Sequence, residues 1–438
     1  MTAIDLNEGQ TAAADALFRF LISKDKEFSI SGPAGTGKTT LMNHVVTHLL
    51  PSYEEDCKLL GIKPVNYEVA LTATTNKATE VLAAATGKPA QTIHSFMNLK
   101  VKDNFKTGES EIVPTPSFVV HTRKLIFVDE ASMIDSKLYR YIQKGTDKTC
   151  KIIYLGDHCQ MAPVFETLSP VYAQAQNTAV LAQPMRNAGQ PALVSLCNRL
   201  RNTVETLDFF QLPETPGVVD YVSGQDAFKF IQSTFGQENL DARVLCYTNA
   251  RVQEYNEHIR TLRGYPEHFT PGETVVNSSA IQIRNGQAMT MLRIEEELFI
   301  KSVAPQTETV VLDEQDPNST FEAYEVELVT PGKNLVRVKV PLDPERFKAL
   351  SRYYARVKDW NTFFKMKNTY PDLRPRDACT VYKAQGSTYD TVFLDLTNIG
   401  SCTQEDQLAR MLYVGASRAR NRLVLFGKLP DRLFKKAA

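Results

Sequence analysis

The chain has 438 residues with no formal net charge, of which 43% are hydrophobic and 23% are charged. This length allows two to four domains, and the composition is that of an ordinary globular protein. Because a neutral chain has no overall field that attracts a polyanion, any nucleic-acid site must be a local groove. The seven cysteines are scattered, with no C-x-x-C pair. They therefore indicate reduced thiols rather than a disulfide framework or a zinc site.

We expect neither a secretory leader nor a membrane span. The first residues, Met-Thr-Ala-Ile-Asp, contain no charged segment followed by an apolar one. Apolar runs also stay shorter than the ~20 residues needed to cross a bilayer. These features predict a cytoplasmic protein.

The first third of the chain alternates between helix and strand signals. Residues 8–22 have the periodicity of an amphipathic helix, residues 28–31 predict a strand before a glycine-rich turn, and residues 39–50 predict a helix. Further β-rich runs occupy residues 68–72, 124–128 and 151–155. Strands that alternate with helices predict a parallel sheet with helices on both faces.

This pattern breaks between residues 97 and 120, where polar, charged, glycine and proline residues surround two short apolar runs. We predict a protruding hairpin there. A second α/β stretch begins near residue 190, with a strand at 243–248 and a helix at 250–262.

Residues 270–340 have an all-β texture, including runs at 324–329 and 335–340, and residues 344–367 are helical in pattern. The α/β texture then resumes at residue 379, with strands expected at 391–395 and 422–426. An inserted module therefore interrupts the second α/β domain.

Residues 32–39, Gly-Pro-Ala-Gly-Thr-Gly-Lys-Thr, match the phosphate-binding pattern G-x-x-x-x-G-K-[ST]. The glycines let backbone N–H groups face the phosphates, and the next helix directs its positive end there. Lys38 is expected to reach the β- and γ-phosphates of ATP, and the Thr39 hydroxyl to bind Mg²⁺. A chance match or an inactive site is the alternative, which the preceding strand and the following helix disfavour. The residues expected to surround the nucleotide are Gly32, Pro33, Ala34, Gly35, Thr36, Gly37, Lys38, Thr39 and Thr40.

An apolar strand ends in two acids, Asp129 and Glu130. Asp129 is placed to hold Mg²⁺ through water, and Glu130 to polarise an attacking water, which favours hydrolysis over transfer to another substrate. An acidic turn at a strand end is the alternative, and the upstream phosphate loop weighs against it.

Six more segments follow one another in a recognisable order: residues 6–10, 71–77, 92–96, 156–163, 381–388 and 412–419. They resemble the Q motif and motifs Ia, Ib, III, V and VI of superfamily 1 DNA helicases of the 5′-to-3′ branch. The resemblance covers most of the chain, and RecD-like enzymes are more distant relatives. Two positions depart from the pattern, since Gln183 replaces a common acid and Tyr382 replaces a common histidine.

The resemblance also assigns roles around the nucleotide. Gln10 would read adenine, and Gln160 would sense the γ-phosphate. A motor that holds ATP between two domains needs a cation from the second domain, because charge develops on the transferred phosphoryl group. Arg418 is the candidate arginine finger, Arg186 the second phosphate arginine, and Gly386 a further nucleotide neighbour. A surface or salt-bridged arginine is the alternative for each of the two.

Single-strand binding combines cations and hydroxyls for phosphates with aromatic faces for bases. Capping and turn chemistry is an equally good explanation for any single Ser or Thr. The 97–120 hairpin resembles the pin that splits a duplex, with Phe105 stacking at the junction. The candidate DNA contacts are Thr74, Lys77, Thr92, His94, Ser95, Phe105, Thr248, Asn249, Lys383 and Ser387.

The expected fold is α/β, with two tandem RecA-like parallel-sheet domains. The first domain comprises residues 1–185 and includes the hairpin at 97–120. The second domain comprises residues 186–268 and 376–438. Residues 269–375, inserted between these two parts, are expected to form an SH3-like module with a helical extension. The expected function is an ATP- and Mg²⁺-dependent DNA helicase that moves 5′ to 3′.

This helicase would act as a monomer on single-stranded DNA and on forked or tailed duplex DNA, in a host cytoplasm if phage-encoded, with replication or single-strand-binding proteins as candidate partners. One alternative is a P-loop switch or kinase. Another is an ATPase subunit of a larger nucleic-acid-processing complex without its own unwinding activity.

Overall fold

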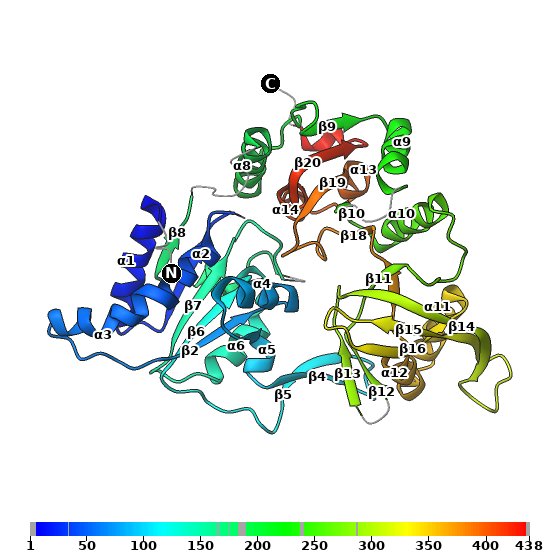
Figure 1. Cartoon of the computed structure of the whole chain (residues 1–438), viewed down its shortest axis with the longest axis horizontal. Coiled ribbons are helices and arrows are strands. Elements are labelled where there is room, and N and C mark those ends of the chain that lie inside the picture. Colours follow the sequence, from blue (N-terminus) through cyan, green and yellow to red (C-terminus); the bar gives the residue numbers. More distant parts are fainter. Residues whose placement is uncertain are drawn as a thin grey trace.

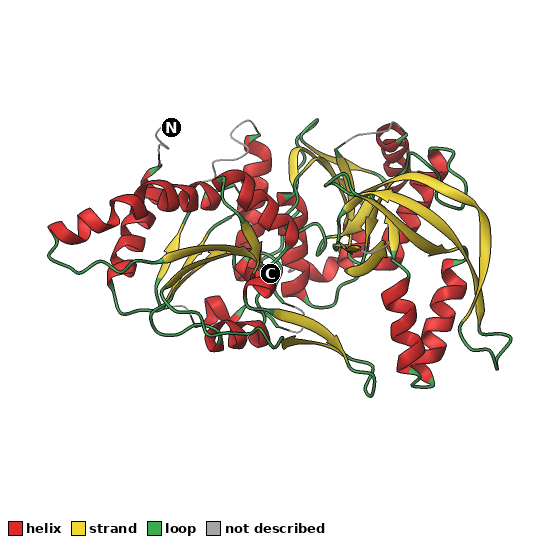
Figure 2. Cartoon of the chain, turned by 60° about the horizontal axis from the view of Figure 1, so that its bottom comes forward, coloured by secondary structure: helices red, strands yellow, loops and turns green. Residues whose placement is uncertain are grey.

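The computed structural model describes residues 6–33, 35–163, 166–174, 176–182, 190–236, 241–285 and 288–434. Two parallel sheets and one antiparallel sheet organise these residues (Figure 1), with helices on both sides of the parallel strands (Figure 2). Helices within the described ranges are too short or too polar to cross a bilayer. All seven cysteines are free thiols, as expected from the sequence, and six of them are buried.

The first sheet has the strand order β3-β2-β6-β7-β1-β8, and every pair in it is parallel. Its strands are β1 (Glu27–Ser31), β2 (Glu68–Ala73), β3 (Ala90–Thr92), β6 (Lys124–Asp129), β7 (Lys151–Gly156) and β8 (Thr178–Val180). Its helices are α1 (Glu8–Ile22), α2 (Lys38–His44), α3 (Leu50–Leu59), α4 (Asn76–Thr86), α5 (Ile93–Phe96), α6 (Ser136–Lys144) and α7 (Pro170–Ala173), with a short turn of 3-10 helix, η2 (Ala131–Met133).

Successive side chains of the central strands point to opposite faces of the sheet, and each face packs in its own hydrophobic core. Leu125 and Phe127 pack with α1 and α2, whereas Ile126 and Val128 pack with α6 on the opposite face. Because both faces are covered, β6 is apolar at consecutive positions instead of alternating with polar ones. The sheet with helices on both faces that the sequence predicts is therefore confirmed.

The helix predicted at 39–50 runs further than expected. A π-helical turn, η1 (Val45–Leu49), follows α2 and leads into α3, which ends at Leu59. Pro51 lies in the first turn of α3. Proline lacks the N–H that an α-helical interior requires, and the wider turn before it lets the helical path continue.

The second sheet has the order β18-β10-β19-β20-β9 and is also parallel throughout. Its strands are β9 (Val219–Val222), β10 (Ala242–Cys246), β18 (Ala378–Thr380), β19 (Tyr389–Asp395) and β20 (Ala419–Phe426). Its helices are α8 (Pro191–Thr206), α9 (Gly224–Phe235), α10 (Asn249–Leu262), α13 (Leu396–Gly400) and α14 (Glu405–Ser417), with a 3-10 turn, η3 (Asp431–Leu433). Segments before and after the inserted module thus form one sheet.

The inserted module is built on an antiparallel sheet of order β16-β15-β14-β11-β17. Its strands are β11 (Thr274–Asn277), β14 (Glu297–Val311), β15 (Thr320–Val329), β16 (Leu335–Pro341) and β17 (Leu373–Pro375), beside a hairpin of β12 (Ile281–Asn285) and β13 (Ala288–Leu292). Alternate residues of β16 are buried, as in a sheet with one solvated face. The helical segment expected at 344–367 is two helices, α11 (Pro344–Arg356) and α12 (Trp360–Thr369), because Lys358 takes a left-handed conformation with φ of 61°.

A hairpin of β4 (Leu99–Asp103) and β5 (Ser110–Pro114) leaves the first sheet and reaches α12 of the inserted module (Figure 1). The Phe105 and Phe364 rings meet edge to face at 5.1 Å. Asn368 Nδ2 donates to Asp103 Oδ2 at 2.9 Å, and Lys367 Nζ donates to Ser110 Oγ at 3.0 Å. Aromatic packing and hydrogen bonds therefore join the hairpin to the module.

Replacing Gly108 by alanine is expected to separate the hairpin tip from α12. A Cβ on Gly108 would lie 2.3 Å from the ring of Trp360, and its φ of +76° is a left-handed value that disfavours other residues. Overpacking of this kind costs about 1–3 kcal/mol. Trp360 is the only tryptophan of the chain, so a red shift of its fluorescence reports the separation.

Gly61→Ala is the matched control for this measurement. Gly61 has a similar φ of +67°, but its added Cβ would meet nothing within 4 Å. It should therefore lose some stability without moving the tryptophan emission. An unshifted spectrum in the Gly108 variant would show that the ring does not rest on the hairpin.

Candidate functional site

The phosphate-binding loop joins the end of β1 to the start of α2. Gly35 and Gly37 take left-handed φ values of 81° and 80°. A Cβ on Gly32 would lie 2.5 Å from the Leu181 carbonyl oxygen and 2.9 Å from Thr36 Oγ1. Each of these glycines is thus required by backbone conformation or by close approach. The loop leads into the N-terminus of α2, where free backbone amide groups favour the binding of an anion.

Lys38 is the first residue of α2, and its ammonium turns back over the loop. Nζ donates to the Gly32 carbonyl at 2.6 Å and to the Pro33 carbonyl at 3.0 Å. Burial lowers its pKa, the carboxylates of Asp157, Glu130 and Asp129 raise it, and the positive charge of Arg418 lowers it further. The lysine therefore lies among three acids of the first sheet and within electrostatic range of an arginine of the second.

Gln10 supports this loop from α1. It is 1% exposed, and its Nε2 donates to the carbonyls of Thr36 at 3.3 Å and Gly37 at 3.4 Å. Its Oε1 accepts from Asn7 N at 3.0 Å as half of a capping box. A hollow of about 190 Å³ lies beside it, lined by Asn7, Glu8, Gly9, Thr36, Val180, Leu181 and Ala182.

The remaining residues predicted to contact the nucleotide lie in this loop or at the start of α2. Thr36 Oγ1 donates to the Pro33 carbonyl at 2.9 Å, which tightens the turn. Thr39 is half-buried on α2 and Thr40 is exposed. Ala34 lies outside the described residues, as do Gln183 and Arg186.

Asp129 and Glu130 stand at the carboxyl end of β6. Asp129 Oδ1 accepts from the Glu130 N–H at 2.8 Å, and burial, together with the charge of Glu130, raises the pKa of Asp129 to about 6. Glu130 has a φ of +54°, a strained value for a residue with a side chain. Thr74 Oγ1 donates to the Glu130 carbonyl at 3.0 Å. The turn thus holds two neighbouring carboxyl groups beside the lysine.

Residues of the second sheet complete this acidic site. Gln385 Nε2 donates to Glu130 Oε2 at 3.4 Å and to Ser132 Oγ at 3.0 Å. The next residue, Gly386, has Glu130 Oε1 and Thr75 Oγ1 each 4.0 Å from the position of an added Cβ. The segment after β18 therefore lies directly over the carboxyl end of β6.

Arg418 follows α14 and is 4% exposed. Its Nη1 donates to the Ser387 carbonyl at 3.2 Å, its Nη2 to Ser417 Oγ at 2.9 Å and its Nε to the Val414 carbonyl at 3.2 Å. The guanidinium is thereby fixed to the segment that covers Glu130.

Asp157 follows β7 and is completely buried. Its Oδ2 accepts from the Tyr413 hydroxyl at 2.6 Å, and its Oδ1 lies 3.6 Å from Arg201 Nε. Asp157, His158 and Cys159 place ligand atoms within 4.8 Å of one another, as in a metal site. Because both carboxylate oxygens already have partners, the grouping is better explained as a structural link to α8 and α14.

Arg410 of α14 holds the rest of this segment. It donates to the carbonyls of His158 at 2.5 Å, Gln160 at 2.6 Å and Thr167 at 3.2 Å. Gln160 itself is buried, and its Oε1 has no hydrogen-bond partner within the described ranges. One helix of the second sheet thus fixes the chain that carries a predicted γ-phosphate sensor.

The predicted DNA contacts on the first sheet lie at the carboxyl ends of β2 and β3 and on the hairpin. Thr92 caps α5, accepting from Ser95 N at 3.2 Å, and burial lowers the pKa of His94. Lys77 is exposed on α4, and Phe105 is 53% exposed although its ring contacts α12.

The predicted contacts on the second sheet have partners of their own. Thr248 caps α10, and Asn249 Oδ1 accepts from Arg374 Nη1 at 3.1 Å. Lys383 Nζ lies 2.8 Å from Glu295 Oε1 and donates to Ser278 Oγ at 2.8 Å. Capping thus explains the hydroxyls of Thr92 and Thr248, and the inserted module neutralises Lys383.

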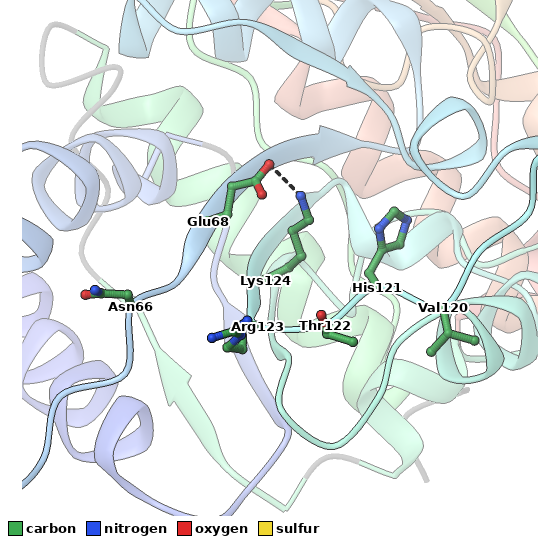
Figure 3. A pocket seen from close by; sticks show the side chains of 7 residues that line it. All are labelled: Asn66, Glu68, Val120, His121, Thr122, Arg123 and Lys124. Atoms are coloured by element: carbon green, nitrogen blue, oxygen red, sulfur yellow. Dashed lines mark ion pairs between the residues drawn. The ribbon is translucent and has the colours of Figure 1, made fainter.

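A larger hollow, of about 450 Å³, is formed by Asn66, Glu68, Val120, His121, Thr122, Arg123 and Lys124 (Figure 3). Lys124 and Glu68 form an ion pair of 2.5 Å within it. It lies at the amino ends of β2 and β6, whereas ligands of open parallel sheets bind at the carboxyl ends. We therefore separate it from the phosphate site.

The recognised segments 381–388 and 412–419 contain Gln385 and Tyr413 without predicting a role for either, and Arg410 lies outside them. All three residues link the two sheets. Arg410 and Tyr413 lie three residues apart on one side of a mostly buried helix. Polar side chains within such a helix need partners, and this was the available signal.

Comparisons with known proteins show which families this chain resembles. Residues 5–215 match the family described as an AAA domain, and residues 377–426 match the UvrD-like helicase C-terminal domain. The ATP-dependent DNA helicase Dda of Enterobacteria phage T4 is 24% identical over 458 residues, which cover 96% of this chain and 99% of the relative. The RecBCD subunit RecD of Buchnera aphidicola is 28% identical over 153 residues, covering 31% of this chain and 23% of that protein.

Among solved structures, a Pif1 helicase from Bacteroides in complex with ADP-AlF3 and single-stranded DNA superposes with a TM-score of 0.50. It is 14% identical and covers 98% of this chain and 95% of its own. This likeness shows the fold, and the predicted mixed α/β arrangement with parallel sheets is confirmed. The resemblance inferred from the sequence motifs is also confirmed, since the phage relative aligns over almost its whole length.

Proposed function

We propose that this chain is a superfamily 1 DNA helicase, which hydrolyses ATP in order to move 5′ to 3′ along single-stranded DNA and to separate duplex DNA. The observation that carries the proposal is the meeting of the two sheets at Glu130. The phosphate loop and acid pair belong to the first sheet, while Gln385 and Gly386 of the second sheet lie against Glu130. Arg418 is bonded to the neighbouring Ser387 and lies within electrostatic range of Lys38.

The residues present fit a triphosphate with magnesium. Lys38 and the loop amides would bind the phosphates, while Thr39 and Asp129 would hold the metal, which supplies charge neutralisation on the phosphate oxygens. Glu130 would polarise the attacking water, and Arg418 would stabilise charge on the transferred group. Adenine would occupy the hollow beside Gln10, where the glutamine braces the loop as well.

Movement would follow from the contacts that cross between the sheets. The Tyr413–Asp157 and Arg410–Gln160 bonds connect β7 to α14, so a change at the γ-phosphate shifts one sheet against the other. Single-stranded DNA would lie across the carboxyl ends of both sheets, where most of the predicted contacts are found.

We propose that the domains are divided as the sequence predicts, with one RecA-like domain for each parallel sheet. Residues 1–185 and the pair 186–268 with 376–438 would form the two RecA-like halves, and 269–375 an SH3-like module with a helical extension. The 97–120 hairpin would act as the separating pin, supported by α12. We propose a monomer that uses tailed or forked duplex substrates.

The decisive experiment measures ATP turnover with and without single-stranded DNA, and unwinding of duplexes tailed at either end. We expect DNA to stimulate turnover and a 5′ tail to be required for unwinding. Turnover that ignores DNA would favour a P-loop switch. Stimulated turnover without unwinding would favour a subunit of a larger complex.

Replacing Arg410 by alanine is expected to uncouple hydrolysis from DNA. The change leaves three carbonyls without their charged donor, and bonds to a charged group contribute about 1.5–3 kcal/mol each. Nucleotide affinity should stay within about twofold, while DNA stimulation of ATP turnover falls at least tenfold. Arg432→Ala, which loses hydrogen bonds to the carbonyls of Gly400 and Cys402 outside this segment, is the control. Normal stimulation in the Arg410 variant would remove this link from the coupling path.

A further inference from the structure

The hydroxyl of Tyr172 is buried and has no hydrogen-bond partner within the described ranges. An unsatisfied buried hydroxyl costs about 1–3 kcal/mol. Phenylalanine would fill the same space without that cost. The hydroxyl therefore needs an explanation, and packing alone does not provide one.

The short helix that carries Tyr172 is fixed against the turn that follows the acid pair. Ser169, at its start, donates through Oγ to the carbonyls of Ile134 at 2.7 Å and Ala131 at 3.2 Å. Both acceptors belong to the chain just after Glu130. The tyrosine is thus held on the same support as the two carboxyl groups.

The tyrosine oxygen reaches the gap between the ends of β6 and β7. A Cβ on Gly156 would lie 2.3 Å from this oxygen, 3.1 Å from Ala131 N and 3.4 Å from Ser132 N. Gly156 is the last residue of β7, and its lack of a side chain is what lets the hydroxyl approach.

The charges around the hydroxyl are those of the proposed phosphate site. Burial raises the pKa of Tyr172 well above its usual value, and the carboxylates of Asp157, Glu130 and Asp129 raise it further. The phenol therefore remains protonated at any working pH. Its oxygen can donate one proton and can also accept a bond.

We propose that Tyr172 is a positioning residue of the phosphate site, whose hydroxyl hydrogen-bonds the water that Glu130 polarises. The inference rests on the proposed ATP hydrolysis. In that reaction the water oxygen bonds to the γ-phosphorus, the bond to the ADP oxygen breaks, and the water proton passes to Glu130. Tyr172 keeps its own proton throughout and acts by holding the water in line.

Tyr172→Phe tests this role, because it removes one oxygen atom and little else. We expect a fall of at least tenfold in the single-turnover rate of ATP hydrolysis and in kcat, with KM unchanged. The affinity for a fluorescent non-hydrolysable ATP analogue should stay within twofold. The unfolding temperature should stay the same or rise, since an unsatisfied group is lost.

Tyr139→Phe is the matched control. Its hydroxyl donates to Glu27 Oε2 at 2.7 Å, away from the three acids. This variant should unfold at a lower temperature and hydrolyse ATP at the normal rate.

A normal hydrolysis rate in Tyr172→Phe would overturn the proposal. So would a slower rate that accompanies weaker analogue binding or a lower unfolding temperature, because the oxygen would then be structural. Failure of the proposed function itself is distinguishable, since the unsubstituted chain would then show no ATP turnover.

Discussion

Replacing Arg418 by alanine is expected to slow single-turnover ATP hydrolysis by about three to five orders of magnitude, the usual contribution of an arginine finger. The side chain is held by Ser387, Val414 and Ser417, within electrostatic range of Lys38. Its cation would therefore be in place before charge develops on the phosphoryl group. Quench-flow measurement, with analogue binding measured in parallel, should show slow chemistry and retained affinity.

Two further variants separate chemistry from folding at this position. Arg418→Lys keeps the charge but loses the forked geometry, so it should recover only part of the rate. Arg422→Ala is the control, because Arg422 pairs with Asp220 at 2.6 Å elsewhere on the second sheet. A near-normal hydrolysis rate in Arg418→Ala would remove this residue from the site.

Replacing Lys38 by alanine is expected to bring ATP hydrolysis below detection while leaving single-strand binding largely intact. Loss of one preorganised donor alone costs about 10²–10³ in rate, and this change also removes a positive charge that acts on the carboxylates of Asp129, Glu130 and Asp157. Burial lowers the pKa of Lys38, so keeping this side chain charged lowers the stability of the folded protein. The variant should therefore fold normally, which its unfolding temperature checks.

Lys137→Ala is the corresponding control, since Lys137 is a half-buried lysine of α6 that pairs with Glu111. DNA binding and ATP turnover should both be normal there. Undiminished turnover in Lys38→Ala would reject the phosphate site. Loss of single-strand binding as well would mean that the loop also contacts DNA.

Features encoded over a few neighbouring residues could be predicted from the sequence. The helix at 8–22 has the predicted bounds, because Asn7 and Gln10 form a capping box at its start. The phosphate loop could likewise be located, because its glycines and lysine are consecutive. The ends of other elements escaped prediction where the cause is not local in sequence. Lys358 ends a helical segment because it takes a left-handed conformation, and no glycine in the sequence marks that position.

Contacts between distant segments could not be predicted. Asp157 and Tyr413 are 256 residues apart, and Gln385 and Glu130 are 255 residues apart. Nothing in either stretch specifies the other as its partner, since only the completed fold brings them together. The motifs therefore located the candidate site, whereas the links through which the two sheets communicate needed the structure.

The interrupted second sheet has a consequence for how the protein is made. β10 pairs with β18 and β19, and β9 pairs with β20, so both early strands have all their neighbours beyond the inserted module. The first sheet is complete once residue 180 has left the ribosome, but the second cannot assemble until β20 has emerged. From the synthesis of β10 until β18 emerges, the nascent chain therefore carries two unpaired strands, an aggregation hazard that the finished protein does not have.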